Sequence, residues 1–448
     1  MQNEEFCILH SIMLPTTRSL LLLLFTAPLM ALGAWFPFME WVAWAYFLFM
    51  LSMMYMDWRA AGDIKQFDLI RTHDSKLSLG AENPIRISLR NRSRRGTQFT
   101  VRDEAPEQFK IETRMLDGQV SPRGTWEQVY RVRPLRRGDY QFGDLTLRWL
   151  SPLGLVMRQA KVNAKEPVKV YPNLLDVRRY DLLLKRNRLQ EMGLRTTRQF
   201  GEGTEFERLR EYLPDDEFRR INWKATARRN FPVTTEYQTE RSQQVIAVLD
   251  VGRMMQSPVA DIAKLDYVVN AVLLLTYVAT GKGDRVGMMS FADDVQHYLG
   301  PRQGRGQFYR MLEFLYAVEP QPVEPDYRKA LAYLAVKQRR RALVVVFTDL
   351  TGGASLNSLV AQMSMLARTS LPLLVTISDP DVVDAAQMKP SDSLGVYQRA
   401  AANQLLDERR VVLDSLRQRG VLTLDVPANQ LSMSVINRYL ELKGRMQL

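Results

Sequence analysis

The spacing of hydrophobic positions changes along this chain, and each change marks a boundary between predicted regions. Residues 20–39 contain no charged side chain, and a second uncharged run extends over residues 41–56 after Glu40. About 20 apolar residues are needed for a helix to cross the hydrocarbon core of a membrane. Residues 1–59 are therefore predicted to form a transmembrane helical hairpin with spans at about 20–39 and 41–56.

Charged residues beside the two runs predict the orientation of the hairpin. Arg18 precedes the first run and Arg59 and Lys65 follow the second, whereas the turn between the runs carries only Glu40. Because basic residues stay on the cytoplasmic side, both ends of the hairpin are expected there. We predict an inner (cytoplasmic) membrane protein with two spans and soluble domains in the cytoplasm. A cleaved signal peptide is the alternative, although the first run is long for one and a second run follows it.

In residues 60–172 the pattern changes to short runs in which apolar and polar positions alternate. Turn signals such as Asp117-Gly118 and Arg137-Gly138 separate these runs. Several closely spaced strands without a helical period predict an antiparallel β-sandwich of immunoglobulin-like architecture. The runs that predict strands include IRISLRN, FTVRD, EQVYRVRP, DLTLRWL and VKVYP.

Residues 243–448 alternate near-continuous apolar runs with amphipathic helical segments. Such runs are typical of parallel strands that are buried on both faces, so a Rossmann-like α/β domain with helices on both sides of its sheet is predicted. The run RVGMMSFADDVQHYLG contains one turn and predicts an antiparallel hairpin at the sheet edge. Helices are predicted at about 264–280, 307–317, 327–337, 356–369, 396–419 and 431–442.

Polar side chains follow three of these predicted strands. QVIAVLD ends at Asp250, RALVVVFTD ends at Thr348 and Asp349, and LPLLVTISD ends at Ser378 and Asp379. Ligands of open parallel α/β sheets bind in the crevice outside the carboxyl ends of the strands. These residues are therefore expected at one shared location, which is the candidate functional site.

The balance of charged residues limits which classes of molecule the protein is expected to bind. The chain has 61 Lys and Arg against 49 Asp and Glu, a net charge of +12. This charge suits either an anionic membrane surface or nucleic acid. Because the basic residues are spread over both soluble regions and no recognised nucleic-acid motif occurs, we expect a membrane surface and no nucleic acid. The single cysteine, Cys7, excludes an internal disulfide framework and fits a reducing compartment.

Two groups of motifs resemble known families. The order of the C-terminal elements, with LDVGRMM after the first strand and VVVFTDL after a later one, is similar to a von Willebrand factor A domain. The preceding EFERLREYLPDDEFRRINWKATAR closely resembles the signature of the bacterial family called domain of unknown function 58. Residues 173–242 are accordingly assigned as a family-signature connector, and Trp223 is expected to be its buried anchor.

The resemblance extends over nearly the whole chain, because that family joins a membrane hairpin, a β-sandwich and this α/β domain in the same order. It implies a membrane-anchored, non-enzymatic adaptor or scaffold that works with a MoxR-type AAA+ ATPase. The implied role is protein maturation or complex assembly, with other envelope or membrane proteins as clients.

The resemblance also implies a place for Mg²⁺, because von Willebrand A domains commonly hold it at an Asp-x-Ser-x-Ser loop with a distant Thr and a Thr-Asp pair. Asp250 matches the first position and Thr348 with Asp349 matches the last, but Gly252 and Met254 stand where the two hydroxyls belong. The position of the distant Thr is replaced near Asp326. The implied ligands are then Asp250, Asp326 and Asp349, with waters completing an octahedron. Alternatively, Asp250 and Asp349 are strand-end turn formers and helix caps.

Two functional classes follow from these residues. In the first, the protein is not an enzyme, and Arg253, Thr348 and Asp349 bind a partner at the rim of the crevice. In the second, a metal-dependent hydrolase uses Asp250, Asp326 and Asp349.

A hydrolase also needs a general base beside its metal. His297 with Asp293 or Asp294 is the one available pair, and a histidine on an edge hairpin is more typical of a surface. Neither HExxH nor G-x-S-x-G occurs, so no enzymatic activity is expected.

Overall fold

The protein is described by a computed structural model that covers residues 12–173, 205–213, 218, 221–229, 231–238, 242–350, 355–390 and 392–444. The chain divides into two compact units, Met1–Asn173 and Leu174–Leu448. The first unit combines apolar helices with three β-sheets, and the second contains an α/β sheet, so the protein is multi-domain and mixed α/β. Most of the predicted connector over residues 173–242 lies outside the described residues.

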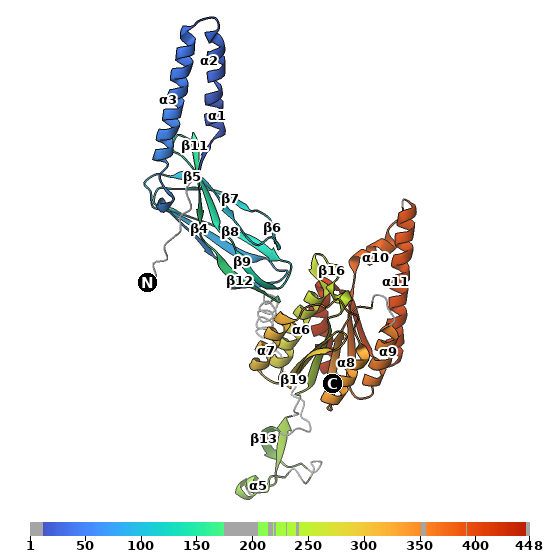
Figure 1. Cartoon of the computed structure of the whole chain (residues 1–448). Coiled ribbons are helices and arrows are strands. Elements are labelled where there is room, and N and C mark those ends of the chain that lie inside the picture. The colour runs from blue at the N-terminus through green and yellow to red at the C-terminus, as the bar shows by residue number, and fades with distance from the viewer. Residues whose placement is uncertain are drawn as a thin grey trace. The chain divides into compact units, whose positions relative to one another are not determined.

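Three apolar helices open the described chain, and two of them, α2 and α3, lie side by side (Figure 1). They are α1 (Thr17–Leu24), α2 (Thr26–Gly33) and α3 (Phe38–Ala60). Among the described residues, α3 is the one helix long and apolar enough to cross a membrane, whereas the stretch Thr17–Gly33 is apolar but shorter.

The helix limits differ from the predicted spans at 20–39 and 41–56. The first helix already begins at Thr17, because the Thr16 hydroxyl accepts a hydrogen bond from the amide of Ser19 at 3.3 Å and caps it. The third begins after Pro37, which places Glu40 inside its first turn. The limits of the uncharged runs therefore do not coincide with the ends of the helices, and the start of α1 is set by the Thr16 cap.

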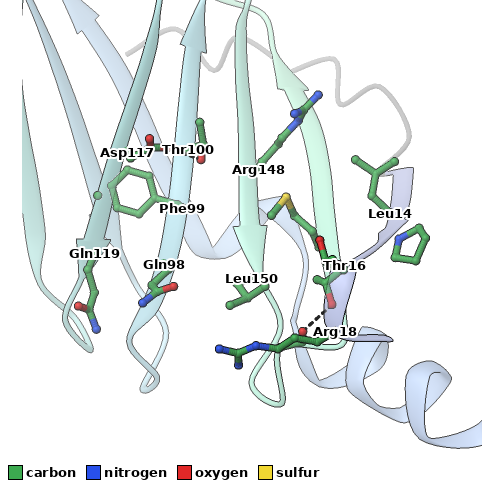
Figure 2. A pocket seen from close by; sticks show the side chains of 15 residues that line it. Leu14, Thr16, Arg18, Gln98, Phe99, Thr100, Asp117, Gln119, Arg148 and Leu150 are labelled. Carbon is green, nitrogen blue, oxygen red and sulfur yellow. Dashed lines mark hydrogen bonds between the residues drawn. The ribbon is translucent and has the colours of Figure 1, made fainter. Parts of the chain in front are cut away.

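The root of the helical hairpin is tied to the turn between two strands, β10 (Leu145–Leu150) and β11 (Val156–Val162). Asp57 of α3 is 1% exposed and accepts hydrogen bonds from the amides of Leu153 and Leu155 at 2.9 and 3.0 Å, and from the Ser151 hydroxyl. The Thr16 hydroxyl donates to the carbonyl oxygen of Gly154 at 2.8 Å (Figure 2). Both ends of the hairpin therefore hold the same turn.

The rest of the first unit is built from short strands in three sheets. A five-stranded sheet has the order β1-β11-β10-β5-β7, a four-stranded sheet the order β2-β4-β8-β6, and a three-stranded sheet the order β3-β12-β9. The remaining strands are β1 (Ile12–Pro15), β2 (Phe67–Thr72), β3 (Lys76–Ser78), β4 (Asn83–Asn91), β5 (Thr97–Asp103), β6 (Phe109–Ile111), β7 (Met115–Val120), β8 (Thr125–Pro134), β9 (Gly138–Phe142) and β12 (Glu166–Tyr171).

Apolar and polar side chains alternate along these strands, so each strand buries one of its two faces. In β4 the side chains of Ile85, Ile87 and Leu89 are fully buried, and the residues between them are more exposed. The five predicted strand runs are all strands in the structure. The prediction of purely antiparallel pairing was wrong at one place, because β3 and β12 pair in parallel. The strand β1 was not predicted, since its four residues directly precede the apolar helices.

The family-signature segment contains strands β13 (Glu205–Glu211) and β14 (Val233–Gln238), which pair in antiparallel fashion, and helix α5 (Trp223–Arg229). The expectation that Trp223 is a buried anchor was wrong. Its side chain is 60% exposed and contacts the ring of Phe218, itself 67% exposed, at a centroid distance of 5.6 Å.

The α/β sheet of the second unit has six strands in the order β19-β18-β15-β20-β21-β22. All neighbours pair in parallel except β18 and β19, which form the predicted antiparallel edge hairpin. The strands are β15 (Gln244–Asp250), β18 (Arg285–Phe291), β19 (Val295–Arg302), β20 (Leu343–Phe347), β21 (Leu371–Ser378) and β22 (Leu422–Pro427), and a small hairpin adds β16 (Pro258–Val259) and β17 (Ile262–Ala263).

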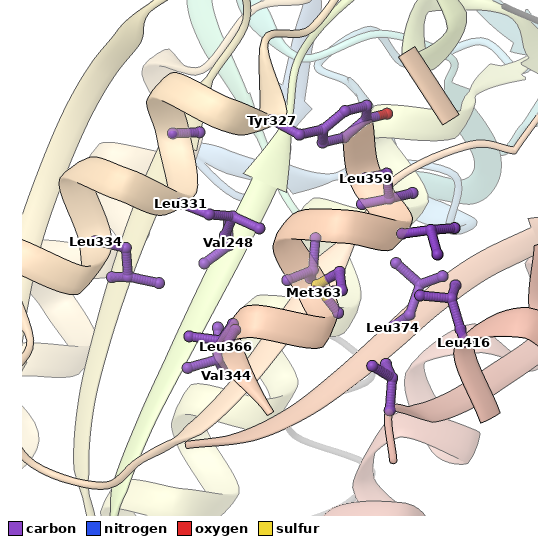
Figure 3. Close-up of a cluster of buried hydrophobic side chains, with 14 of the residues drawn as sticks. Val248, Tyr327, Leu331, Leu334, Val344, Leu359, Met363, Leu366, Leu374 and Leu416 are labelled. Carbon is purple, nitrogen blue, oxygen red and sulfur yellow. The ribbon is translucent and has the colours of Figure 1, made fainter. Parts of the chain in front are cut away.

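Helices cover both faces of this sheet, which explains the near-continuous apolar strands. On one face α8, α9 and α11 contribute Leu334, Met363 and Leu416 to a core with Val248 and Val344 (Figure 3). On the other, α6 packs against α7 and α12 (Figure 1). The helices are α6 (Lys264–Gly281), α7 (Arg305–Ala317), α8 (Tyr327–Lys337), α9 (Ser355–Leu366), α10 (Pro380–Gln387), α11 (Ser393–Gln418) and α12 (Leu431–Gly444).

The six predicted helices are confirmed within a few residues at each end, and α10 was missed. Asp379 caps α10 by accepting from the amide of Asp381 at 3.1 Å, and Pro380 occupies its first turn. This start signal was present in the sequence but had been assigned to a strand end.

Asp57→Ala should uncouple the hairpin from the sheet beneath it. The substitution leaves a buried amide, a part-buried amide and a buried hydroxyl without their acceptor, so we expect the free energy of unfolding to fall by about 3 kcal/mol. Thermal and chemical unfolding of the full chain in non-ionic detergent measure this loss. The matched change Asp74→Ala, at an exposed carboxylate of the same unit, should leave stability unchanged. Equal stability of the two variants would contradict the role of Asp57.

Candidate functional site

The carboxyl ends of three neighbouring strands bring the predicted polar residues together. Asp250 ends β15, Thr348 and Asp349 follow β20, and Asp379 follows β21. These strands are adjacent and parallel, so their ends meet at one edge. The chain also reverses direction across the sheet here, because β18 lies on one side of β15 and β20 on the other. The expected shared location is therefore confirmed, and it lies at a topological switch point.

Asp250 lies at this edge of the sheet and is 2% exposed. One of its oxygens accepts from the Thr348 hydroxyl at 2.6 Å and the Tyr327 hydroxyl at 3.3 Å, and the other accepts from the amide of Gly252 at 2.7 Å. Burial raises the pKa of Asp250 to about 6, although these hydrogen bonds oppose the shift. Burial and the nearby Asp250 charge raise the pKa of Tyr327 well above its usual value.

A lysine supplies the nearest cation. Lys264 is the first residue of α6, and its Nζ atom lies 2.7 Å from Asp349 Oδ2 and 3.7 Å from Asp379 Oδ2. Both side chains of the closer pair are buried, with 5% exposure for Lys264 and 1% for Asp349. Arg409 of α11 adds a second cation at 3.5 Å from Asp349 and pairs with Asp425 at 2.7 Å.

The residues around Asp250 do not fit a magnesium site. A Cβ atom at Gly252 would lie 2.9 Å from Pro325 Cδ and 3.0 Å from the carbonyl oxygen of Val323, so the space of the missing hydroxyl is already filled. The segment over residues 321–325 closes this side, and the amide of Arg253 donates to the Val323 carbonyl at 2.8 Å.

The predicted ligand set Asp250, Asp326 and Asp349 is also not assembled. Asp326 caps α8 by accepting from the amide of Lys329 at 3.0 Å, and Asp349 is held by Lys264. Across the described residues, no three His, Cys, Asp or Glu side chains are grouped so that they could hold a metal ion. A buried ammonium group instead supplies the positive charge beside Asp349.

Among the predicted partner-binding residues, the structure exposes Arg253 and buries Thr348 and Asp349. The latter two are 2% and 6% exposed. Arg253 pairs with Glu324 at 3.0 Å across the mouth of the crevice, and both side chains are more than half exposed. Asp326 and Lys329 lie next to them on the start of α8. We call Arg253, Glu324, Asp326 and Lys329 the rim.

His297 does not form the pair that a hydrolase would need. Its Nδ1 atom lies 3.3 Å from the Ser290 hydroxyl, and its ring packs against Phe314 at a centroid distance of 4.6 Å. Asp294 instead accepts from the amide of Val295 at 2.7 Å.

Sequence reasoning missed Lys264, Tyr327, Arg409 and Asp425. One signal was available for Lys264, because a lysine in the first turn of a helix opposes the helix dipole and calls for a compensating acid. Tyr327, Arg409 and Asp425 carry no local signal. Helical periodicity for Tyr327 and Arg409, and strand alternation for Asp425, assign a face of the element but do not show which residues pack against that face.

Comparisons with known proteins place the chain among proteins of undefined role. Residues 208–382 match the family model described as "Protein of unknown function DUF58". Uncharacterized proteins of Mycobacterium bovis and Mycobacterium tuberculosis are each 27% identical over 186 residues, which is 41% of this chain and 58% of theirs. The uncharacterized protein YeaD of Bacillus subtilis is 23% identical over 319 residues, which is 68% of this chain and 76% of that protein.

Among solved structures, the crystal structure of the conserved hypothetical protein BatB from Bacteroides thetaiotaomicron is similar. It is 14% identical, with a TM-score of 0.33, and the match covers 46% of this chain and 100% of that chain. The chain spans 58% of the length of its mycobacterial relatives. Neither the family description nor the names of the relatives indicate an enzymatic activity.

The raised pKa of Asp250 predicts a pH dependence of stability. The unfolded carboxyl titrates near pH 3.9, whereas the folded one titrates at about 6. The folded state therefore binds the proton more tightly, and the stability that this provides is lost as pH rises through about 6. From about pH 4 to about pH 7, wild type should lose about 2 kcal/mol relative to Asp250→Asn. Denaturant unfolding over this range checks the difference, and parallel pH curves for the two proteins would contradict it.

Removal of metal should not affect the stability of the wild-type protein, because Lys264 neutralises Asp349. We expect the same unfolding midpoint in EDTA and in Mg²⁺. In contrast, Lys264→Met should cost about 3–5 kcal/mol, since it breaks a buried ion pair and leaves an under-compensated carboxylate. Lys282→Met, at an exposed lysine just beyond the other end of α6, is the matched control. A clear destabilisation of wild type by EDTA would show that an ion contributes after all.

Proposed function

We propose that this chain, whose residues 208–382 match the DUF58 family model, is a membrane-anchored, non-enzymatic adaptor that works with a MoxR-type AAA+ ATPase. Its task would be protein maturation or complex assembly, with envelope or membrane proteins as clients. In this proposal the sheets of the first unit form an immunoglobulin-like sandwich, and the α/β sheet is a von Willebrand factor A-like domain that docks the partner.

One observation supports docking over catalysis. The two carboxylates at the strand ends already have partners within the protein, because Lys264 and Arg409 neutralise Asp349 and hydroxyl groups bind Asp250. A closed ion pair leaves no open coordination position and no free base for a reaction. The rim, in contrast, exposes charges of both signs, which suits a specific and electrostatically guided contact.

The membrane anchor is supported by α3, which is long and apolar enough to cross a membrane. We propose that the apolar stretch Thr17–Gly33 forms the second span, since it lies against α3. Both soluble parts then follow in the cytoplasm of an inner membrane, as the basic residues that flank the hairpin suggest.

Affinity capture of the full chain from native membranes, followed by mass spectrometry, tests this function. We expect an AAA+ ATPase to be recovered equally in Mg²⁺ and in EDTA, because the described residues of the rim form no group of His, Cys, Asp and Glu that could hold a metal ion. Arg253→Glu should reduce the recovery about tenfold or more, since a rim charge is reversed and Glu324 gains a like neighbour. Stability should change little, because both side chains are exposed.

The matched control is Arg285→Glu, which makes the same charge change at an exposed residue at the opposite end of β18. Recovery of the ATPase with this variant should equal that with wild type. Capture of no ATPase by wild type, or an equal loss with both variants, would contradict docking at the rim.

A further inference from the structure

A groove lies on the outer face of the five-stranded sheet in the first unit, beside the start of α1 (Figure 2). Its volume is about 950 Å³, which is the size of a small-molecule site. Residues from all five strands and from the beginning of α1 line it. The groove belongs to a single compact unit and is separate from the crevice of the α/β sheet.

Two arginines give the groove its charge. Arg18 stands in the first turn of α1, is exposed, and has no carboxylate partner among the described residues. Figure 2 shows its side chain extending past Leu150 toward Gln98. Arg148 of β10 donates through Nε to the Gln159 side chain at 2.6 Å, which orients the guanidinium. No described carboxylate pairs with its two terminal nitrogens.

The two acids of this face each have a partner, although only one of these partners is a cation. Asp117, which also lines the groove, accepts a hydrogen bond from the Thr100 hydroxyl at 2.6 Å. A second cavity of about 140 Å³ continues past Arg148 on the same sheet face, and there Glu104 pairs with Lys161 at 3.3 Å. The two cavities together are lined by four basic residues, Arg18, Arg102, Arg148 and Lys161, against the two acids Asp117 and Glu104. The face is therefore suited to an anion.

The position of the groove relates this charge to a membrane. Arg18 follows directly on the hairpin root, which Asp57 and Thr16 fix to the turn over residues 151–155. Leu153 at this turn is 55% exposed, and Leu14, Leu150 and Met157 add apolar surface to the groove. If the apolar helices enter a bilayer, the arginine end of the groove lies at the depth of the lipid phosphates, with apolar side chains beside it.

We propose that this groove binds the phosphate-bearing headgroup of an anionic phospholipid. The planar guanidinium groups of Arg18 and Arg148 suit the oxygens of a phosphate, which they can contact through paired hydrogen bonds. The side-chain amides of Gln98 and Gln119 also line the groove and could bond to the hydroxyl groups of a glycerol headgroup. The inference rests on the membrane placement within the proposed function and is independent of the ATPase partner.

Lipid binding to the delipidated full chain in neutral detergent tests the site without any partner protein. Short-chain phosphatidylglycerol is titrated against short-chain phosphatidylcholine and glycerol 3-phosphate, and bound species are counted by native mass spectrometry. We expect saturable binding of phosphatidylglycerol, and binding of phosphatidylcholine that is weaker by about tenfold or more. Glycerol 3-phosphate should bind weakly, because it lacks the acyl chains that would contact the apolar side chains of the groove.

Variants locate the binding. Arg148→Gln and Arg18→Gln should each weaken phosphatidylglycerol about tenfold or more, because each removes a charge-assisted contact. Arg148→Lys should bind more tightly than Arg148→Gln but more weakly than wild type. A lysine keeps the positive charge but cannot make the paired hydrogen bonds of a guanidinium group. Arg90→Gln, at an exposed arginine of the four-stranded sheet, is the matched control and should bind as wild type does.

Three results would overturn the site: equal binding of both lipids by wild type, tighter binding of glycerol 3-phosphate than of the lipid, or equal affinity in all the variants. The first two comparisons need no variant, so they decide the proposal even if a substitution prevents folding. Capture of the ATPase is unaffected by any of these results, and the two proposals can therefore fail separately.

Discussion

The buried ion pair between Lys264 and Asp349 is the interaction on which the candidate site depends. Asp349 follows β20 and its carboxylate is buried. This charge must be neutralised, because burying an isolated charge is very unfavourable. Lys264 provides the opposite charge from the first turn of α6, where a cation opposes the helix dipole, so the pairing explains an otherwise unfavourable position. The pair thereby connects α6 to the end of β20, and Arg409 connects α11 to the same carboxylate.

A second buried carboxylate, Asp57, lies near the other end of the chain. It accepts hydrogen bonds from backbone amides and a hydroxyl, whereas Asp349 is neutralised by a cation. Its hydrogen bonds join α3 to the turn after β10, and the Trp149 indole donates to the carbonyl of Ala61 at 2.9 Å beside them. The apolar helices and the sheet that carries the proposed lipid groove thus share a tightly bonded junction.

Much of the fold was readable from periodicity, because burial on both faces gives a parallel strand an unmistakable run such as VIAVLD. The edge hairpin, the six predicted helices and the alternating strands of the first unit follow from the same reasoning. The predictions were wrong where a helix cap or the exposure of a side chain could not be inferred from the spacing of apolar residues. Asp379 was interpreted as a strand end although it caps α10, and Trp223 was expected inside although it is exposed. The parallel pairing of β3 with β12 could not be predicted from the sequence of either strand.

The sequence by itself determined that Asp250, Thr348 and Asp349 share one edge of a sheet, since each ends or directly follows an apolar strand. It could not determine what neutralises them. Lys264 and Asp349 are 85 positions apart, and Asp326 accepts a hydrogen bond from the amide of Lys329. Helix placement decided that an ammonium group meets Asp349, that a backbone segment fills the space beside Gly252, and that Asp326 caps a helix. The reason is that strand ends depend on local pattern, whereas charge pairing depends on how separate helices pack against them.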